Sequence, residues 1–333
     1  MRTLLIEPGP NFSVADVHRG LLVGLRANGV TAQSFNLGDR LSFYTQAEIN
    51  GVRAFAYEEA CRLACQSIRA AAWDWGPDVV VVVSSFFVPP EVFLSLRNRG
   101  VHVVLWCTES PYEDERQLRQ ARYADTVVLN DPVNIDEYRK HNPRTFYVPH
   151  GYDPAVHHAN GRTDEHPFCM VGTGYPSRIE FLEKADLPAG SVLAGNWQQV
   201  ADDSPLLAFL AHERGVCIDN ADTAALYRAS QTTLNLYRRE AMSPELVEGW
   251  AMGPREVEAA ACGVFMVRDA RPEGDALFPM LPIVSTPAEL GDVLRWAAAN
   301  PELRGDAAER ARAAVADRTF ADTVASFLRH IGA

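Results

Sequence analysis

The stretch GPDVVVVVSS, residues 76–85, decides the fold class of this chain. Five consecutive valines stand there between a Gly-Pro-Asp sequence and a pair of serines. An unbroken β-branched run of this length predicts a strand that is buried on both faces, as in a parallel sheet. The chain is therefore expected to belong to the α/β class.

Short apolar strands and helical segments alternate on both sides of this run. Near the start, Thr3–Ile6 predicts a strand, and Val17, Leu21, Leu22 and Leu25 form the stripe of a helix. Further strands are predicted at 101–106, 126–129, 145–148, 168–171, 191–194, 216–219, 232–237 and 264–267. Further helices are predicted at 89–100, 117–123, 134–140, 177–185, 223–229, 256–262, 287–299, 301–316 and 320–330.

A looser polar stretch at 153–167 is the best linker in the chain. Two alternating halves joined by a linker predict two doubly wound, Rossmann-like domains that face each other across a cleft. In such sheets ligands bind outside the carboxyl ends of the strands. Helix N-termini lie at the same edge and suit phosphate groups.

Composition, charge and cysteine content exclude several classes of function. The 333 residues carry 31 Lys and Arg against 43 Asp and Glu, a net charge of -12, which argues against broad clamping of a nucleic-acid backbone. None of the six cysteines forms a C-x-x-C pair, so neither a zinc knuckle nor a thioredoxin motif is expected, and a reducing, cytoplasmic compartment is favoured. No apolar run is long enough for a membrane span, and the apolar N-terminal stretch is too short for a signal peptide.

A glycine pair follows a predicted strand in the second half. Gly172, Thr173 and Gly174 let the backbone approach an anion, and Arg178 adds a cation at the start of the next helix. No further glycine stands near Ser177, which disfavours a nicotinamide site. The alternative is a tight turn with a surface arginine.

A second motif begins a later helix. Arg255 and Glu258 are three residues apart after Pro254, so both point the same way in its first turn. The carboxylate can accept two ribose hydroxyls while the arginine faces a pyrophosphate. The alternative is that the acidic residue only favours the helix dipole.

A third group leaves the strand at 232–237. Asn235, Tyr237 and Arg238 stand at its end, and Arg268 and Arg271 follow the next strand in the same way. These arginines either hold phosphate or pair with nearby acids.

In the first half, titratable side chains follow two predicted strands. Asp16 and His18 lie in the loop and helix start at 11–18, and Glu109 follows the strand that ends at Trp106. The alternatives are that Asp16 only caps the helix and that His18 is an exposed histidine. The acidic run at 113–115 is interpreted as a solvated surface, and no group of residues has the spacing of a metal site.

Together these motifs resemble GT-B glycosyltransferases, and among them the group-1-like branch related to spore-maturation-type glycosyltransferases of actinobacteria and their phages. The resemblance covers about residues 145–330, and 108–111 and 130–132 extend it into the first half. The residues that carry it are VPHGYD at 148–153, VGTG at 171–174, NLYR at 235–238 and REVEAAACG at 255–263.

The resemblance implies a division of labour between domains. It implies an acceptor domain at 1–155, a nucleotide-sugar donor domain at 156–316, and a final helix at 317–333 that packs back on the first domain. It also implies that Glu258 binds the donor ribose, and that the 172–174 loop, Arg178 and Arg255 face the diphosphate. Retaining members carry a glutamate eight residues before the ribose glutamate; here Trp250 stands there and Glu248 is displaced by two.

The sequence therefore predicts a hexosyltransferase-type enzyme that uses a nucleoside-diphosphate sugar, with UDP as the nucleotide and with no cofactor or metal. An inverting reaction needs a base from the first domain, for which Asp16 ranks ahead of His18 and Glu109. The acceptor stays open between a protein, a glycan, a small molecule and a modified nucleic-acid base. The alternatives are a UDP-sugar 2-epimerase on the same fold and a non-catalytic nucleotide-sugar-binding protein.

Overall fold

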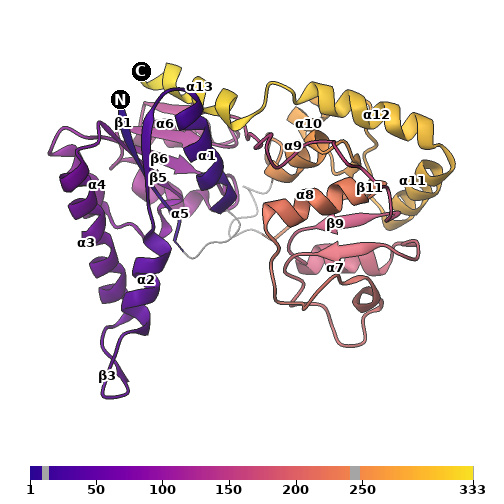
Figure 1. Ribbon diagram of the computed structural model, residues 1–333, viewed down its shortest axis with the longest axis horizontal. Helices are drawn as coiled ribbons and strands as arrows, with labels where there is room; N and C mark the ends of the chain where they lie inside the picture. The colour runs from indigo at the N-terminus through magenta and orange to yellow at the C-terminus, as the bar shows by residue number, and fades with distance from the viewer. Residues whose placement is uncertain (10–14, 241–247, 333) are drawn as a thin grey trace. The chain divides into compact units, whose positions relative to one another are not determined.

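The computed structural model describes residues 1–9, 15–240 and 248–332, which divide into two compact units (Figure 1). Unit 1 contains Met1–Pro149 and the final segment from Phe320, and unit 2 contains His150–Ala241 and Trp250–Thr319. The boundary thus falls before His150, so residues 150–155 belong with the second unit. Part of the predicted loop and helix start at 11–18 lies outside the described residues.

Unit 1 is built on a six-stranded parallel sheet in the order β2-β1-β5-β6-β7-β8. The order places the valine strand β5 near the middle, between β1 and β6. The strands are β1 (Arg2–Ile6), β2 (Thr31–Phe35), β5 (Val79–Val83), β6 (His102–Cys107), β7 (Thr126–Leu129) and β8 (Thr145–Tyr147).

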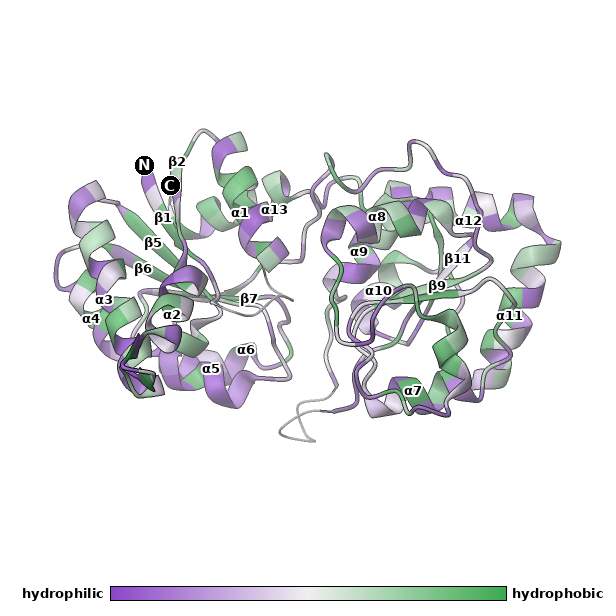
Figure 2. Ribbon diagram, turned by 60° about the horizontal axis from the view of Figure 1, so that its bottom comes forward, coloured by the Kyte–Doolittle hydropathy of each residue, from purple (hydrophilic) through white to green (hydrophobic). Residues whose placement is uncertain are grey.

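The valine strand divides its side chains between two cores. Val79, Val81 and Val83 pack with α1 and α13, whereas Val80 and Val82 pack in the core that the other helices cover. This confirms a strand buried on both faces, and Figure 2 shows β5 and β6 as hydrophobic ribbons between the helices. The helices are α1 (Ala15–Ala27), α2 (Leu37–Gln46), α3 (Tyr57–Trp75), α4 (Pro90–Arg97), α5 (Asp114–Ala121), α6 (Ile135–His141) and α13 (Phe320–Ile331), with a 3-10 turn, η2 (Ser85–Phe87).

The C-terminal helix α13 lies against α1, at the other end of the chain (Figure 1). Two glycines of α1 allow the close approach. A Cβ atom on Gly20 would lie 2.0 Å from the Phe320 ring, and one on Gly24 would lie 2.3 Å from the Phe320 carbonyl oxygen. The last helix therefore completes one face of the unit 1 sheet.

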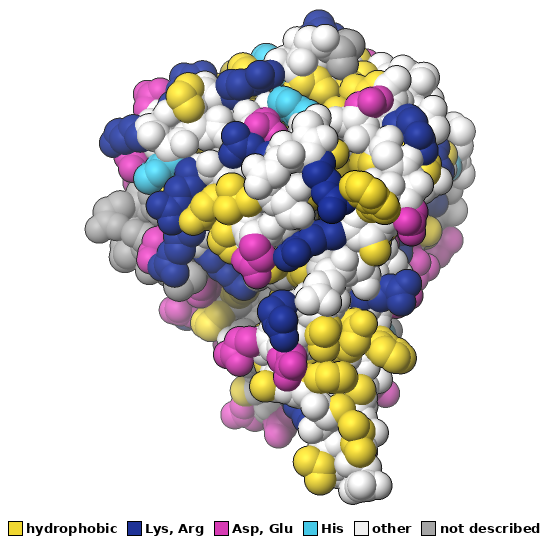
Figure 3. Space-filling view, turned by 90° about the vertical axis from the view of Figure 1, so that its left-hand side faces the viewer, with side chains coloured by type: hydrophobic (Ala, Val, Ile, Leu, Met, Phe, Trp, Pro, Cys, Tyr) yellow, Lys and Arg dark blue, Asp and Glu magenta, His cyan; other side chains and the backbone are white. Residues whose placement is uncertain are grey.

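A short antiparallel hairpin of β3 (Glu48–Ile49) and β4 (Val52–Arg53) separates α2 from α3. Figure 3 shows hydrophobic side chains gathered at this narrow lower end of unit 1. Phe43, Ile49 and Val52 are each about two-thirds exposed there. The sequence patterns predicted none of β2, α2, α3 and this hairpin, whose strands are only two residues long.

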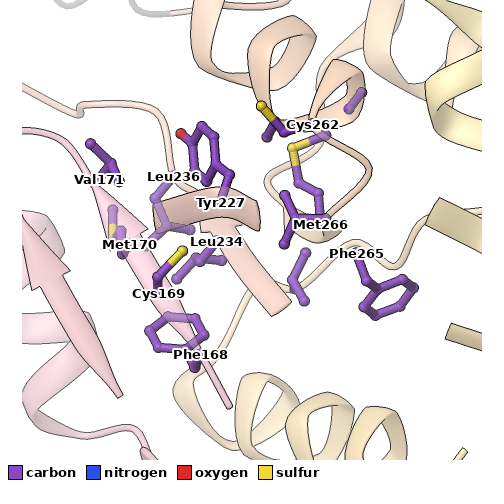
Figure 4. Packing of buried hydrophobic residues seen from close by; sticks show 14 of the residues in the cluster. Phe168, Cys169, Met170, Val171, Tyr227, Leu234, Leu236, Cys262, Phe265 and Met266 are labelled. Carbon is purple, nitrogen blue, oxygen red and sulfur yellow. The ribbon is translucent and has the colours of Figure 1, made fainter. Parts of the chain in front are cut away.

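Unit 2 has a four-stranded parallel sheet in the order β10-β9-β11-β12. Its strands are β9 (Cys169–Val171), β10 (Val192–Ala194), β11 (Thr232–Asn235) and β12 (Phe265–Arg268). Its helices are α7 (Pro176–Glu183), α8 (Asn220–Ala229), α9 (Pro254–Ala261), α10 (Pro272–Leu277), α11 (Pro287–Ala299) and α12 (Pro301–Ala314), with a 3-10 turn, η3 (Pro205–Phe209). A single core of apolar side chains joins the strands to α8 and α9 (Figure 4).

Two expectations about local structure differ from the observed fold. No strand forms at 216–219, where Val216 and Cys217 are exposed; Asp219 instead caps α8 by accepting a hydrogen bond from the Asp222 N–H at 2.9 Å. The polar stretch at 153–167 packs on unit 2, since Arg228 donates to the Val156 carbonyl and the His166 N–H donates to Ala229.

Candidate functional site

The loop after β9 is held tightly against the loop after β10. The Gly172 and Gly174 N–H groups donate to the carbonyls of Ala194 and Asn196 at 3.0 and 2.8 Å. A Cβ atom on Gly174 would lie 2.4 Å from the Trp197 ring, so only glycine fits there. Gly174 therefore serves a close approach to Trp197, and the N–H groups of both glycines are engaged within the protein.

The N-terminus of α7 holds a carboxylate. Glu240 accepts hydrogen bonds from the Ser177 N–H at 2.9 Å and from the Ser177 hydroxyl at 3.2 Å. Burial raises the pKa of Glu240, but the hydrogen bonds from Ser177 and Arg239 outweigh it and lower the pKa overall. An anion thus occupies the helix end where the sequence predicted a phosphate, and no spacing rule connects residues 177 and 240.

Arg178 and Arg238 flank the same aromatic ring at the carboxyl edge of the sheet. Their guanidinium carbons lie 5.2 and 5.8 Å from the centre of the Tyr175 ring. Arg178 also donates to the carbonyls of Thr173, at 2.9 Å, and Leu236. The loops after β9 and β11 are therefore joined through one arginine, and the predicted residues of both loops lie together.

A second arginine and ring pair follows β12. The Arg271 guanidinium lies 3.7 Å from the centre of the Tyr237 ring, and the Tyr237 N–H donates to Asp269 at 2.8 Å. Arg268 is buried and pairs with Asp275 at 2.7 Å, so it is a structural ion pair. Asn235 ends β11, opposite Arg268 in the register.

The first turns of α9 place Arg255 beside Glu258. Arg255 Nη1 donates to Glu258 Oε2 at 2.7 Å and to Asn220 Oδ1 at 2.8 Å. Asn220 in turn donates to Glu258 Oε1 at 3.3 Å. The first residue of α8 is thus part of the site, and sequence reasoning missed it because 35 or more residues separate it from its partners.

Glu258 stays ionised despite its burial. Desolvation raises its pKa, but the charge of Arg255 and the hydrogen bonds from Arg255 and Asn220 outweigh this effect and lower the pKa overall. A second histidine, His150, is buried near the same carboxylate, and desolvation lowers its pKa to about 4. The result is an ionised, well-oriented hydrogen-bond acceptor.

In unit 1, Asp16 and His18 differ in environment although both belong to the start of α1. Asp16 is in the first turn, 14% exposed, and pairs with Arg19 at 3.4 Å. His18 is buried and its ring lies 3.1 Å from the Ser34 hydroxyl; desolvation lowers its pKa to about 4. The alternative of an exposed histidine is wrong, because His18 faces the core.

Glu109 leaves the carboxyl end of β6 and is half-buried. The nearby acidic run at 113–115 is not a uniformly solvated surface, since Asp114 is fully buried. Ser110, Asn134 and Tyr138 donate to Asp114 at 2.7–3.0 Å. This network fixes the loop that carries Glu109. Asp16 follows β1 in the chain, and Glu109 follows β6. Because β5 lies between these two strands in the sheet, their carboxyl ends are about 10 Å apart.

A cavity of about 440 Å³ opens beside the end of β5. Phe86, Phe87 and Pro89 contribute apolar walls, and Arg116 lies over the Phe86 ring at 4.1 Å. The Ser84 and Thr108 hydroxyls are hydrogen bonded, which joins the segments after β5 and β6. Tyr57 and Cys61 of α3 and Gln120 of α5 also line the cavity, which therefore lies between these two helices and the segment after β5.

The described part of the chain contains neither a metal-ligand cluster nor a membrane-spanning helix. Among residues 1–9, 15–240 and 248–332, no three His, Cys, Asp or Glu side chains are grouped as metal ligands would be. Within the same ranges, every helix is too short or too polar to cross a membrane.

Solved structures of similar fold cover nearly the whole chain. Sucrose-phosphate synthase from Thermosynechococcus elongatus has a TM-score of 0.67 at 16% identity, with 99% of each chain covered. HepE of Anabaena, solved with UDP, has a TM-score of 0.62 at 11% identity, with 99% of this chain and 100% of that one covered. A protein assigned as a UDP-N-acetylglucosamine 2-epimerase, from Listeria monocytogenes, has a TM-score of 0.59 at 13% identity and covers 99% and 96%.

These likenesses confirm the predicted GT-B architecture of two Rossmann-like units. No curated protein sequence matches the chain significantly. The family model described as "Glycosyl transferase-like" matches residues 155–329, slightly more than half of the chain. These residues contain three of the four motifs that carry the sequence resemblance, at 171–174, 235–238 and 255–263. The chain belongs to the glycosyl transferase-like family.

Proposed function

We propose that this protein transfers a sugar from a nucleoside-diphosphate sugar, with UDP as the nucleotide, to an acceptor bound by unit 1. The observation that carries the proposal is the ionised, buried Glu258 held between Arg255 and Asn220 at the start of α9. A fixed carboxylate suits two ribose hydroxyls, because each of its oxygens accepts more than one hydrogen bond. HepE, which shares the fold, was solved with UDP.

The donor diphosphate is assigned to the arginines at the carboxyl edge of the unit 2 sheet. Arg178 and Arg238 lie around Tyr175, and Arg255 lies on the first turn of α9. Guanidinium groups match phosphate oxygens and stay charged at every working pH. They stabilise the charge that the departing diphosphate gains, so we propose that no divalent metal or cofactor is required. Activity is then expected to persist in EDTA.

The reaction proposed is an inverting transfer. The acceptor oxygen attacks the anomeric carbon, the bond from that carbon to the diphosphate oxygen breaks, and a base in unit 1 takes the acceptor proton. Asp16 is the preferred base, because its side chain is partly exposed whereas the His18 ring is buried in the core. Glu109 is the second choice, at the end of β6.

The cavity at the end of β5 is the proposed acceptor site. Its volume of about 440 Å³ lies in the range of small-molecule pockets, and it stands at the edge where α/β sheets bind ligands. A small molecule, a sugar unit of a glycan, an exposed protein side chain and a modified nucleic-acid base remain alternatives. All six cysteines are free thiols, which suits the cytoplasm as the proposed compartment.

A thermal-shift screen against UDP-, GDP-, dTDP- and ADP-sugars tests the donor assignment. A ligand at 100 times its dissociation constant is expected to stabilise the protein by about 2.7 kcal/mol. UDP-sugars are expected to give the largest shift, and no shift with any of the four classes would contradict the proposal.

The second candidate function is that of a UDP-sugar 2-epimerase, which is favoured by the fold shared with the Listeria protein. Such an enzyme converts a UDP-sugar without an acceptor. Binding without turnover of any kind would indicate a non-catalytic protein.

A further inference from the structure

The start of α9 lacks the usual side-chain cap. Gly253 is the N-cap residue and has no side chain, and Pro254 follows at the first helical position. Ser, Thr, Asp or Asn normally accept a hydrogen bond from the first turn at this point. The direction in which Arg255 and Glu258 leave the helix therefore depends on some other contact.

Glu256 supplies that contact. Its Oε2 atom accepts a hydrogen bond from the Gly253 N–H at 2.9 Å and another from the Tyr237 hydroxyl. The side chain is fully buried, and Tyr237 stands just after β11. One carboxylate thus ties the first turn of α9 both to its own N-cap and to the end of a neighbouring strand.

We propose that Glu256 is a positioning residue for donor binding: by joining Gly253 to Tyr237, it fixes the first turn of α9 and with it the directions of Arg255 and Glu258. The inference rests on the proposed function, because it assumes that these two side chains bind the donor. Glu256 itself, fully buried, does not touch the donor.

The charged groups around Glu256 come from each packed element. They are Tyr237 after β11, Arg268 on β12, Asp269 and Arg271 in the following loop, and Glu273 and Asp275 on α10. Burial raises the pKa of Glu256 to about 7, while Tyr237, the Gly253 N–H and the two arginines oppose the rise. Burial also raises the pKa of Tyr237 far above its usual value, so its hydroxyl keeps the proton that it donates.

Another helix of the chain offers a matched control for substitutions of Glu256. Glu289 is the same residue at the same position of α11, and its Oε2 accepts from the Ser285 and Thr286 N–H groups at 2.7 and 3.1 Å. It is exposed and has no contact with the donor residues described above. Glu256→Ala and Glu289→Ala each remove one helix-end carboxylate, but only the first removes the connection to β11.

Calorimetric titration of the full chain with UDP-glucose tests the proposal. Glu256→Ala is expected to weaken binding about tenfold, the effect of about one lost hydrogen bond. Glu256→Gln is expected to recover part of that loss, because a neutral amide oxygen accepts the same hydrogen bonds more weakly than a carboxylate. Tyr237→Phe is expected to weaken binding about threefold, and Glu289→Ala is expected to bind normally. Equal affinity in Glu256→Ala, Glu256→Gln and wild type would overturn the proposal; failure of the wild type to bind would overturn the proposed function with it.

A further variant separates capping from positioning. A Cβ atom on Gly253 would meet only the Tyr237 ring at 3.8 Å, so Ser fits there and restores a cap. Gly253→Ser combined with Glu256→Ala is expected to recover thermal stability but not affinity for UDP-glucose. Recovery of both would overturn the proposal.

The pH dependence of the affinity for a UDP-sugar distinguishes a positioning role of Glu256 from a purely structural one. A UDP-sugar has no phosphate monoester that titrates near pH 6. Wild-type affinity is therefore expected to rise as the pH rises through about 7, when Glu256 loses its proton and accepts both bonds. In Glu256→Gln this rise should be absent, and an identical pH profile in both proteins would overturn the proposal.

Discussion

Arg255 Nη1 lies 2.7 Å from Glu258 Oε2, and both side chains leave the same face at the start of α9. Asn220, at the start of α8, closes the arrangement by contacting both partners. The pair combines an ionised acceptor for hydroxyl groups with a cation for an anionic ligand. This is the chemistry that one nucleoside diphosphate requires.

Replacing Glu258 by Ala is expected to weaken binding of a UDP-sugar by about 1.5–3 kcal/mol, because hydrogen bonds to a charged group are lost. Asn220→Ala should weaken it less, since Arg255 still orients the carboxylate. Isothermal titration calorimetry measures both effects. Glu302→Ala, at an exposed position in the first turn of α12, is the control. Unchanged affinity in Glu258→Ala would refute the ribose assignment.

Arg178→Ala and Arg255→Ala are expected to lower turnover about 10²–10³-fold, and donor affinity by less, because the leaving diphosphate gains charge at the transition state. Steady-state kinetics at saturating donor and calorimetry together separate the two effects. Arg295→Ala, an exposed arginine paired with Asp186 and Asp292, should behave as wild type. Equal losses in binding and turnover would indicate uniform binding instead.

Substitution of the catalytic base is expected to lower turnover about 10²–10⁴-fold while donor affinity stays normal. Asp16→Asn should show this loss, with His18→Ala and Glu109→Gln compared under the same conditions. Glu115→Gln, an exposed acid on α5, serves as the control. Near-normal turnover in all three variants, or retained anomeric configuration by NMR, would contradict the inverting mechanism.

Glu240→Gln is expected to strengthen binding of a UDP-sugar, because the Glu240 carboxylate now holds the N-terminus of α7, where it repels a second anion. Glu180→Gln, on the exposed side of the same helix, should have no effect. Calorimetry at low ionic strength is the suitable measurement. Weaker binding in Glu240→Gln would show that the site needs this carboxylate and that the phosphate lies elsewhere.

Buried neutral histidines predict a loss of stability in acid. The pKa of His150 falls from 6.5 to about 4 on folding, so the unfolded chain binds more protons between these values and the folded state loses stability as the pH falls through them. The shift corresponds to about 3 kcal/mol when complete. Urea unfolding of wild type and His150→Gln at pH 4.5–7.5 measures it. The difference in unfolding free energy between the two should shrink towards low pH; a constant difference would contradict the assignment.

Much of the fold could be predicted because strands buried on both faces need unbroken apolar runs, as in Val79–Val83. The same criterion failed at 216–219, where a short run of similar residues is exposed and leads into the Asp219 cap. The burial of His18 was also readable, since His18, Leu21 and Leu25 are spaced three and seven apart and share one helix face. From the sequence, His18 was instead considered only as a titratable candidate base or an exposed histidine.

The site residues on α9 were predictable because Arg255 and Glu258 are three apart on one helix. Asn220, Glu240 and the Glu256–Tyr237 contact were not, because each depends on segments that meet only after folding. The glycines at 172 and 174 were expected to let the backbone approach an anion. In the structure their N–H groups bond to the loop after β10.

The most direct test of the account is the fate of UDP-glucose and UDP-N-acetylglucosamine during incubation with the full chain, followed by mass spectrometry. Glycosyl transfer predicts release of UDP, slowly to water and faster with a suitable acceptor, at a rate that Glu258→Ala lowers. Conversion of the UDP-sugar to an epimer without release of UDP would contradict the account.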